Sequence, residues 1–476
     1  MKRIPADKKV IQNVEVIDIA EDGKGVGKAE ELVIFIEKAI PGDVVDIELF
    51  KKKKNFAEAK IQNLIKPSAY RTQPFCPHFG VCGGCKWQHM DYEAQLHFKQ
   101  KSVIDALERL AKVDTSFADP ILRSFDTRYY RNKLEFTFSN KRWLTDDDIR
   151  DNETQDMDAL GFHIPQRFDK ILQIETCYLQ TDPSNEIRNR LSDFAKRSSI
   201  SFYDLRSHKG TLRNVIIRTS TTGEVMVIVV FAYPSQEETD LVLGFLKENF
   251  PQITSLLYII NEKKNDTIFD QEIIMYSGND HIFEEMPVDH PEGERLKFKI
   301  GPKSFYQTNS LQAYELYKIA REYAGLQGDE LVYDLYTGTG TIANFVAKKA
   351  KHVVGIEYVP DAIEDAKVNS LINNIDNTTF FAGDIKDILT ADFVAEQGKP
   401  DVIITDPPRA GMHPDVVQRL LEIEAPKIVY VSCNAATQAR DIGILKEKYE
   451  LKKIQPVDMF PHTQHVENVV LLTLKD

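Results

Sequence analysis

Short runs of alternating apolar and polar residues fill the N-terminal part of the chain. Between residues 12 and 64 the runs VEVIDIA, LVIFIEKA, VVDIELF and AEAKIQNLI are separated by the glycine-rich stretch EDGKGVGKA and the turn sequence IPGDV. Alternation with a period of two predicts half-buried strands, and closely spaced turn signals predict that these strands are short. We therefore expect residues 1–68 to form a small OB-like β-barrel.

The middle of the chain has a mixed pattern. Helical periodicity runs through YEAQLHFKQKSVIDALERLAKV, and strand-like runs follow at KLEFTFS, NVIIRTS, VMVIVVFAY and LLYIIN. Antiparallel strands with helices between them predict an α+β domain over residues 69–297. The run VMVIVVFAY is less than half as long as the ~20 apolar residues that a membrane-spanning helix needs, so we interpret it as a buried strand.

The last third of the chain alternates strand-like and helical patterns. The runs LVYDLY, HVVGIEY, TFFAGD, DVIITDPP and KIVYVSC are separated by amphipathic segments such as AIEDAKVNSLINN, and a final strand is expected at VENVVLLTL. This alternation predicts an α/β fold with a doubly wound, mostly parallel sheet over residues 298–476. In such a sheet ligands bind at the carboxyl ends of the strands.

Length and charge place few limits on the partners of the protein. A chain of 476 residues is long enough for two or three domains. The formal net charge is −13, yet four lysines stand at 51–54 and an acidic run at 144–158. The net charge therefore neither supports nor excludes a nucleic-acid partner. Because the first residues are polar, we expect no secretory signal, and we expect a cytoplasmic monomer without a membrane partner.

Two stretches combine aromatic and basic residues. The lysine run lies between phenylalanines in FKKKKNF, which suits backbone attraction and base stacking of single-stranded RNA. A lysine-rich hairpin also keeps the edge of a sheet soluble, which is the alternative interpretation. Trp87 and the stretch RYYRNKLEF at 128–136 also suit RNA, although Tyr129 and Tyr130 fit an ordinary strand equally well.

A glycine turn joins the first strand of the expected C-terminal sheet to a helix, in YDLYTGTGTIANF. Gly338 and Gly340 permit the turn and let a ligand approach the backbone closely. Asp334 precedes the turn, and Glu357 ends the next strand, where its carboxylate can accept both hydroxyls of a ribose. Nicotinamide enzymes share this logic, but the three-glycine GxGxxG pattern is absent here.

The arrangement resembles the cofactor motif of class I S-adenosylmethionine methyltransferases. Asp384 in FAGD matches the adenine-side position of these enzymes. The resemblance implies S-adenosylmethionine as the cofactor, with a nicotinamide cofactor as the alternative.

Polar clusters follow three of the expected strands: TDPPRAG, SCN and HTQHVEN. They should converge on one cleft, which gives the lone Cys433 a chemical use. A thiolate can add to C6 of a uracil ring and make C5 nucleophilic enough to take a methyl group, after which Glu467 can remove the C5 proton. Asp406 can orient the ring, and Arg409 can contribute to the electrostatics of the cleft. The alternative for Cys433 is a buried cysteine acting as a small hydrophobic residue.

Five motifs carry a resemblance that covers essentially the whole chain: SFYQTN, DLYTGTGT, TDPPRAGM, VYVSCN and DMFPHTQHVENVVLL. In this order they look like the RNA uracil-C5 methyltransferases that make 5-methyluridine, which often carry an N-terminal TRAM barrel. The resemblance implies that Cys433 is the nucleophile, Glu467 the base and Asp406 a contact to uracil. The residues that it implies for S-adenosylmethionine are Gln307, Asp334, Tyr336, Gly338, Glu357, Asp384 and Asp406.

The other four cysteines suggest a metal site. Cys76, Cys82 and Cys85 form a C-x5-C-x2-C array, and Cys177 is the remaining partner. Four thiolates can hold either zinc or an iron-sulfur cluster, and the spacing alone leaves both open. The family resemblance implies a 4Fe-4S cluster. Because methylation moves no net electrons, we expect this cluster to brace the central domain or to position RNA.

The substrate expected from the resemblance is RNA, and 23S ribosomal RNA is favoured because bacterial transfer-RNA members commonly lack both the barrel and the cysteine array. Transfer RNA is the alternative within the family. Cytosine-C5 and amino-group methyltransferases fit less well, because Cys433 follows serine rather than proline and Arg409, not an aromatic residue, follows the double proline. A non-catalytic iron-sulfur RNA-binding protein is the alternative from another class. We expect the target uridine to be flipped out before attack.

Overall fold

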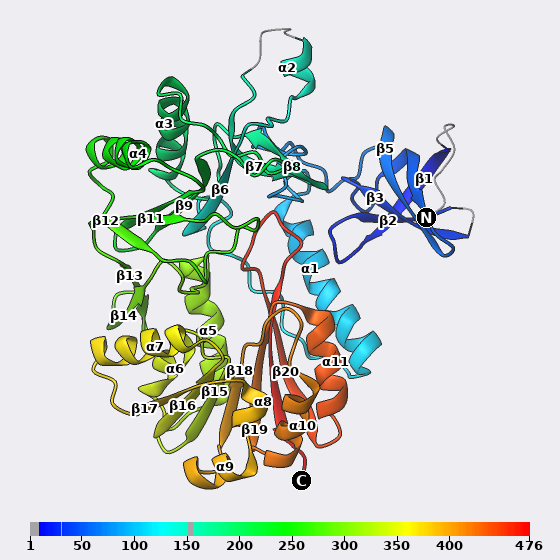
Figure 1. The fold of residues 1–476 in the computed structure, drawn as a ribbon. Helices are drawn as coiled ribbons and strands as arrows, with labels where there is room; N and C mark the ends of the chain where they lie inside the picture. The colour runs from blue at the N-terminus through cyan, green and yellow to red at the C-terminus, as the bar shows by residue number, and fades with distance from the viewer. Residues whose placement is uncertain (1–8, 30, 151–155) are drawn as a thin grey trace.

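The computed structural model describes residues 9–29, 31–150 and 156–476, and Figure 1 shows their three parts: an N-terminal barrel, a central sheet domain and a C-terminal sheet domain. Residues 151–155 of the acidic run lie outside the described residues. In the described part of the chain, no helix is long and apolar enough to cross a membrane.

The N-terminal part is a closed five-stranded barrel, as expected. Its strands follow the order β1-β2-β3-β5-β4 around the barrel. Alternate residues such as Val16, Ile34 and Ile47 point inward and are fully buried, which is the period-two pattern of the sequence. The strands are β1 (Val10–Ile19), β2 (Gly25–Ala29), β3 (Leu32–Glu37), β4 (Val44–Lys52) and β5 (Phe56–Lys66).

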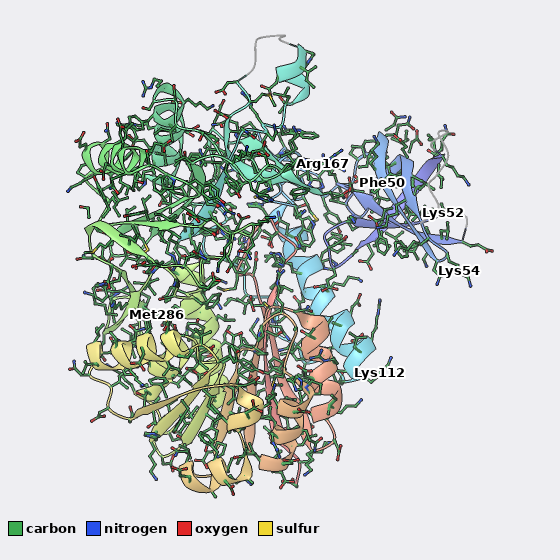
Figure 2. All side chains as sticks on the ribbon, in the orientation of Figure 1. Phe50, Lys52, Lys54, Lys112, Arg167 and Met286 are labelled. Carbon is green, nitrogen blue, oxygen red and sulfur yellow. The ribbon has the colours of Figure 1, made fainter. Side chains whose placement is uncertain are left out.

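The lysine hairpin of the barrel is exposed. Phe50 is 40% exposed, and Lys52 and Lys54 also lie on the surface, where Figure 2 labels all three. Lys53 Nζ lies 5.1 Å from the centre of the Phe56 ring. The hairpin is therefore accessible, and its contact with RNA stays a prediction.

The central domain is a seven-stranded sheet in the order β12-β11-β10-β9-β6-β7-β8. Every residue of β10 is buried, which explains why its sequence is a continuous apolar run rather than an alternating one. Helices α3 (Ser184–Arg197) and α4 (Gln236–Asn249) pack on the sheet. The strands are β6 (Lys133–Ser139), β7 (Ala159–Ile164), β8 (Arg167–Gln173), β9 (Leu212–Thr219), β10 (Val225–Phe231), β11 (Ser255–Ile260) and β12 (Ile274–Gly278).

Part of the expected central region packs on the C-terminal domain. Helix α1 (Tyr92–Ala106) continues into a π-helical turn, η1 (Leu107–Ala111), and buries Val103 and Leu107 against the C-terminal sheet. The hairpin of β13 (Ile282–Pro287) and β14 (Arg295–Ile300) spans the expected boundary at residue 297. A short helix, α2 (Asp146–Arg150), follows β6 along the chain.

The C-terminal domain is a seven-stranded sheet in the order β17-β16-β15-β18-β19-β21-β20, parallel except for β21, which is antiparallel to both neighbours. The strand order reverses between β15 and β18, so a crevice is expected there at the carboxyl ends. The strands are β15 (Leu331–Leu335), β16 (His352–Glu357), β17 (Thr378–Ala382), β18 (Val402–Thr405), β19 (Lys427–Ser432), β20 (Tyr449–Val457) and β21 (Glu467–Leu474).

Helices cover both faces of this sheet (Figure 1). Helices α5, α6 and α7 contribute to the apolar core on one face, and α1, α10 and α11 to the core on the other. Their bounds are α5 (Ser310–Ala324), α6 (Thr341–Ala347), α7 (Pro360–Ile372), α8 (Ile385–Ile388), α9 (Ala391–Gln397), α10 (Pro414–Ile423) and α11 (Ala435–Leu445).

A buried ion pair fastens α1 to the β20–β21 loop, residues 458–466. Lys99 Nζ lies 2.6 Å from Asp458 Oδ1, and both side chains are fully buried. Lys99 also donates to the Phe460 carbonyl at 2.9 Å, and the Tyr92 hydroxyl donates to Asp458 Oδ2 at 2.8 Å. These bonds satisfy both buried charges, so the loop that leads into β21 is held firmly in place.

Candidate active site

The structure places Cys433 and Glu467 side by side. Cys433 follows the last residue of β19, and Glu467 is the first residue of β21. Antiparallel pairing of these strands sets Ser432 opposite Asn468, so the next residues along the ladder are Cys433 and Glu467. Asn434 then begins α11 by accepting a hydrogen bond from the Ala436 amide at 3.0 Å.

Acidic neighbours and burial govern the protonation of this pair. Burial and the nearby Asp406 raise the pKa of Glu467 to about 8. Burial also raises the pKa of Asp406, which follows β18, to about 7. Burial and both carboxyls raise the pKa of the Cys433 thiol to about 11, against an opposing effect of Arg409. A carboxyl with a pKa near neutrality is suited to general acid-base chemistry.

The glycine turn forms the second part of the cleft. Tyr336, Gly338 and Gly340 all adopt positive φ, at 65°, 55° and 74°. A Cβ on Gly338 would have nothing within 4 Å, so the backbone is open to a ligand there. A Cβ on Gly340 would lie 2.8 Å from the Ala366 Cβ, because α6 and α7 pack closely at this point.

Asp334 carries an unused hydrogen-bond acceptor. Its Oδ2 accepts from the Thr337 hydroxyl at 2.5 Å, whereas its buried Oδ1 has no partner among the described residues. Burial raises the pKa of Asp334 to about 7, although the Thr337 hydrogen bond opposes this. A buried acceptor without a partner is costly in a folded protein, so this atom is a candidate contact for a ligand donor.

The other expected cofactor residues lie around the same strand ends. Glu357 accepts from the Gly338 amide at 3.1 Å and from the Val359 amide at 3.0 Å, and thereby shapes the turn. Asp384 begins α8, and Lys386 Nζ lies 3.1 Å from its Oδ2, which helps to lower the pKa of Asp384. Gln307 is buried just before α5, and its side chain opposes the rise in the pKa of Tyr317.

Tyr317 is a site residue that the sequence did not reveal. It is buried on α5, and burial together with Asp406, Asp334 and Glu467 raises its pKa well above the usual value. The ring therefore connects the two halves of the cleft. In the sequence Tyr317 occupies an ordinary apolar position of an amphipathic helix, so no local signal marks it.

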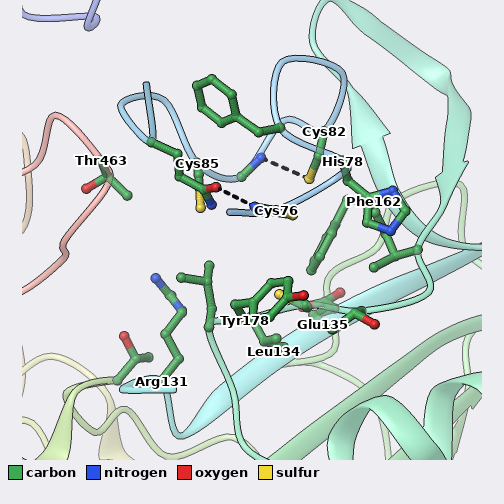
Figure 3. A pocket seen from close by; sticks show the side chains of 18 of the residues that line it. Cys76, His78, Cys82, Cys85, Arg131, Leu134, Glu135, Phe162, Tyr178 and Thr463 are labelled. Carbon is green, nitrogen blue, oxygen red and sulfur yellow. Dashed lines mark hydrogen bonds between the residues drawn. The ribbon is translucent and has the colours of Figure 1, made fainter. Parts of the chain in front are cut away.

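The four remaining cysteines line one cavity of about 430 Å³ (Figure 3). Burial raises the pKa of Cys82 to about 11 and that of Cys85 to about 12. Among the described residues, no group of three or more His, Cys, Asp or Glu side chains is arranged to hold a metal ion. The cavity thus gathers Cys76, Cys82, Cys85 and Cys177, while the expected cluster stays a prediction.

The expectation that Trp87 stacks on RNA is wrong. Trp87 is only 2% exposed, and its indole N–H donates to the Gly23 carbonyl of the barrel at 3.1 Å. Tyr130 is also buried, and its hydroxyl donates to the Pro461 carbonyl at 3.0 Å. Tyr129 alone of these three side chains is exposed. Burial of an amphipathic ring with its donor satisfied is a structural role.

The cysteine cavity and the active site share the β20–β21 loop. The His462 carbonyl accepts hydrogen bonds from the Lys86 amide at 2.8 Å and the Trp87 amide at 3.0 Å, directly after the cysteine array. Thr463 lines the cysteine cavity (Figure 3). Glu467 lies four residues after Thr463 along the chain, so the cysteine cavity and the active site are structurally connected.

The reversal of strand order, the glycine turn and the acidic strand ends together define a class I methyltransferase. Residues 267–475 match the family described as tRNA (Uracil-5-)-methyltransferase, and residues 10–61 match the TRAM domain.

Two bacterial relatives match nearly the whole chain. A Bacteroides thetaiotaomicron protein described as an uncharacterized RNA methyltransferase is 58% identical over 461 residues, which cover 96% of this chain and 100% of the relative. A Porphyromonas gingivalis protein of the same description is 55% identical over 467 residues, which cover 96% and 99% of the two chains.

A solved structure is similar over the same extent. It is the Pyrococcus abyssi tRNA (uracil-54, C5)-methyltransferase in complex with S-adenosyl-L-homocysteine, with a TM-score of 0.74, 28% identity, and coverage of 97% of this chain and 100% of that chain. This chain belongs to the RNA uracil-5-methyltransferase family and is an RNA methyltransferase.

Proposed function

We propose that the protein transfers a methyl group from S-adenosylmethionine to C5 of a uridine in RNA, through a covalent adduct of Cys433. The observation that carries this proposal is the placement of a thiol directly after β19 beside a buried carboxyl at the start of β21. Asp406 raises the pKa of Glu467, so it also belongs to this cluster. A non-catalytic RNA-binding protein would need none of these groups.

In the proposed reaction the Cys433 thiolate bonds to C6 of the uracil, and the C5–C6 π electrons move toward O4. The resulting nucleophilic C5 bonds to the methyl group as the methyl–sulfur bond breaks, which leaves S-adenosylhomocysteine. Glu467 then takes the C5 proton, and the C6–sulfur bond breaks to restore the C5–C6 double bond and the thiolate. One proton is released overall, and no electrons enter or leave.

The cofactor residues of this proposal follow from the cleft. S-adenosylmethionine supplies an electrophilic methyl group when it is bound. The free Oδ1 of Asp334 and the buried Gln307 are placed for its polar groups. Glu357 ends β16 and Asp384 lies just after the neighbouring β17, where a ribose and an adenine would lie. Tyr336 and Gly338 supply the open backbone of the turn.

We propose 23S ribosomal RNA as the substrate, because the chain combines a barrel with four cavity-lining cysteines. One observation favours a second candidate, transfer RNA: the similar Pyrococcus abyssi enzyme is a tRNA (uracil-54, C5)-methyltransferase. Both substrates are tested by the same experiment.

The experiment offers unmodified ribosomal RNA and transfer RNA to the enzyme together with methyl-labelled S-adenosylmethionine, followed by nucleoside analysis. We expect labelled 5-methyluridine from the wild type and none from Cys433→Ala. The RNA that carries the label identifies the substrate. Equal methylation by Cys433→Ala would eliminate the covalent mechanism, and label at another nucleoside would eliminate the assignment to uridine C5.

We also propose that the cysteine cavity holds a 4Fe-4S cluster through Cys76, Cys82, Cys85 and Cys177. Soft thiolates suit such a cluster, and thiols whose pKa is raised by burial need a cationic occupant to ionise. A cluster needs its ligands spread around a cavity rather than gathered on one ion. When bound, the cluster would link the cysteines of residues 76–85 to Cys177, which follows β8.

This assignment is tested on anaerobically purified protein. A brown sample with a broad absorption near ~400 nm and four irons per chain would support it. A colourless protein with stoichiometric zinc would eliminate it in favour of the zinc alternative.

A further inference from the structure

Arg409 is bonded to the segment that carries the nucleophile. Its backbone carbonyl accepts hydrogen bonds from Asn434 Nδ2 at 3.3 Å and from Thr437 Oγ1 at 3.2 Å. Asn434 is the N-cap of α11 and directly follows Cys433, and Thr437 lies in the first turn of this helix. The Arg409 guanidinium also lies near the Cys433 thiol, where its charge opposes the rise in the pKa of that thiol. Loop 406–411 and the thiol therefore have a fixed relative position.

The guanidinium of Arg409 is also held from the opposite side. Its Nη2 lies 2.7 Å from Nδ1 and 3.1 Å from Nε2 of His465, a residue of the β20–β21 loop. A guanidinium can only donate, so the imidazole nitrogen that it contacts must be an acceptor. Arg409 thus bridges the helix that follows the nucleophile and the loop that leads to Glu467.

Gln464 contacts the same imidazole ring. Its side-chain amide lies 3.4 Å from His465 Nε2, and its Oε1 has no partner among the described residues. The imidazole therefore lies between Arg409 and a residue that packs on Gly23 of the barrel.

The charges around His465 and around the Cys433 sulfur agree with this arrangement. Burial and the cations Arg409, Lys99, Arg131 and Lys86 lower the pKa of His465 to about 4, so the ring stays neutral. The charged groups that face the Cys433 sulfur are the carboxyls of Glu467 and Asp406, which disfavour a thiolate, and Arg409, which favours it. Among these three, Arg409 is the single group that stabilises the negative sulfur.

We propose that Arg409 is a catalytic residue that stabilises the Cys433 thiolate, and that His465 is a positioning residue that aims the guanidinium at the sulfur. The proposal deepens the proposed function, because it rests on Cys433 acting as the nucleophile. On ionisation the thiol proton passes to solvent, and its electron pair stays on sulfur. Arg409 then releases the sulfur from this contact as the bond to C6 forms.

The test measures the thiol directly and needs neither RNA nor methyl transfer. RNA-free enzyme is treated with iodoacetamide between pH 7 and 12, a range that includes the raised pKa of the Cys433 thiol, and mass spectrometry follows alkylation of the peptide that contains Cys433. Because iodoacetamide reacts with the thiolate, the midpoint of the rate reports the ionisation of sulfur. The variants are Arg409→Gln, Arg409→Lys and His465→Ala. Arg419→Gln is the matched control, because it removes an exposed arginine of α10 that pairs with Glu422.

We expect Arg409→Gln to move the midpoint to higher pH. Alkylation at pH 7.5 should slow by about tenfold for each pH unit that the midpoint moves, because the thiolate fraction falls by that factor. Arg409→Lys should recover part of the alkylation rate, since lysine keeps the positive charge but lacks the planar guanidinium. The alkylation rate of His465→Ala should lie between those of Arg409→Gln and the wild type. Thermal unfolding identifies any variant that fails to fold.

Unchanged alkylation midpoints in folded Arg409→Gln and His465→Ala would overturn the proposal, even if both variants methylate poorly. The outcome is also separate from that of the proposed function. If the wild type fails to methylate uridine while its alkylation midpoint still depends on Arg409, the function is wrong and the arginine contact stands.

Discussion

At the scale of single residues, the site depends on carboxyls that bind protons unusually tightly. Glu467 has a pKa of about 8 because it is buried beside Asp406. Below that pH most molecules carry a protonated Glu467, which cannot accept the C5 proton. The rate of the elimination step should therefore rise with pH and level off near pH 8.

Glu467→Gln should keep the addition of Cys433 and the methyl transfer but lose the elimination. We expect turnover to fall by about 10²- to 10⁴-fold, the usual contribution of a general base, while a covalent enzyme–RNA complex accumulates. Denaturing gel electrophoresis with labelled RNA measures it. The double variant Cys433→Ala/Glu467→Gln is the control, and a complex that survives in it would show that the linkage is not through Cys433.

The same carboxyls make the stability of the ligand-free protein depend on pH. Asp334 has a usual pKa of 3.8 and a folded pKa of about 7, so the folded state holds this proton more tightly than the unfolded chain does. Its contribution to stability is present in full below the unfolded pKa and is lost as the pH rises to about 7.

We therefore expect the free energy of unfolding, measured with urea, to fall between about pH 4 and pH 7. Asp334→Asn should reduce this fall, because an amide has no proton to lose. Asp114→Asn, at an exposed carboxyl whose pKa is lowered, is the control and should leave the fall unchanged. An equal fall in Asp334→Asn would contradict the assignment.

At the scale of elements, the two glycines of the turn have different roles. Gly340→Ala would place a Cβ 2.8 Å from Ala366 on α7, whereas Gly338→Ala meets open space, and both residues have positive φ. Backbone strain of about 1–3 kcal/mol is expected in both variants. Gly340→Ala should additionally separate α6 from α7 and lose more stability.

Chemical denaturation of the two variants measures this difference, and titration with S-adenosylhomocysteine adds a second readout. Gly338→Ala should stay well folded and lose affinity, because its new methyl group enters the space left for a ligand. Equal stabilities for the two variants would contradict the packing argument.

Strands and turns could largely be predicted because their signals are local. The period-two runs of the barrel and the continuous apolar run of β10 each reflect which faces are buried. Strand β20 was not expected, since its sequence YELKKIQPV is polar at the sheet edge and gains its partner only from β21. The packing of α1 on the C-terminal sheet had no signal either, because a helix pattern shows an apolar face but not what covers it.

The site could be predicted in part for the same reason. Cys433 and Asp406 follow strands that end at one edge, and Glu467 begins the antiparallel β21 at the same edge, so their convergence follows from the fold. Tyr317 and His465 could not be assigned, since their surroundings come from elements distant in the sequence. Trp87 was misassigned because an aromatic residue beside basic ones has the same sequence pattern whether it meets RNA or Gly23 of the barrel.

At the scale of the whole molecule, the ion pair of Lys99 and Asp458 joins the central segment to the loop before β21. Lys99→Met should leave Asp458 buried without a countercharge and cost about 3–5 kcal/mol of stability. Lys99→Met/Asp458→Asn should recover part of this loss. Urea denaturation measures both variants, and Lys101→Met, at a partly exposed lysine of the same helix, is the control. A loss no larger than that of the control would contradict the assigned role.

The hydrogen bonds from the Lys86 and Trp87 amides to the His462 carbonyl predict how a change in the cysteine cavity affects the active site. Cys82→Ser should weaken the array that places the Lys86 and Trp87 amides on the His462 carbonyl. We expect faster amide hydrogen exchange over residues 462–467, while the barrel keeps its protection. Exchange that is unchanged in these residues would show that the cavity and the catalytic loop are independent.

The contacts that join α1 to the β20–β21 loop also determine when the protein can become active as it folds. Lys99 and Asp458 are 359 positions apart, and Gln95 and His462 are 367 apart. Contacts between such distant positions form slowly, because both sheets must be assembled before these residues can meet. Until then Glu467 has no fixed place beside Cys433. The separate domains can thus fold early, while the active site is completed only when the last long-range contact forms.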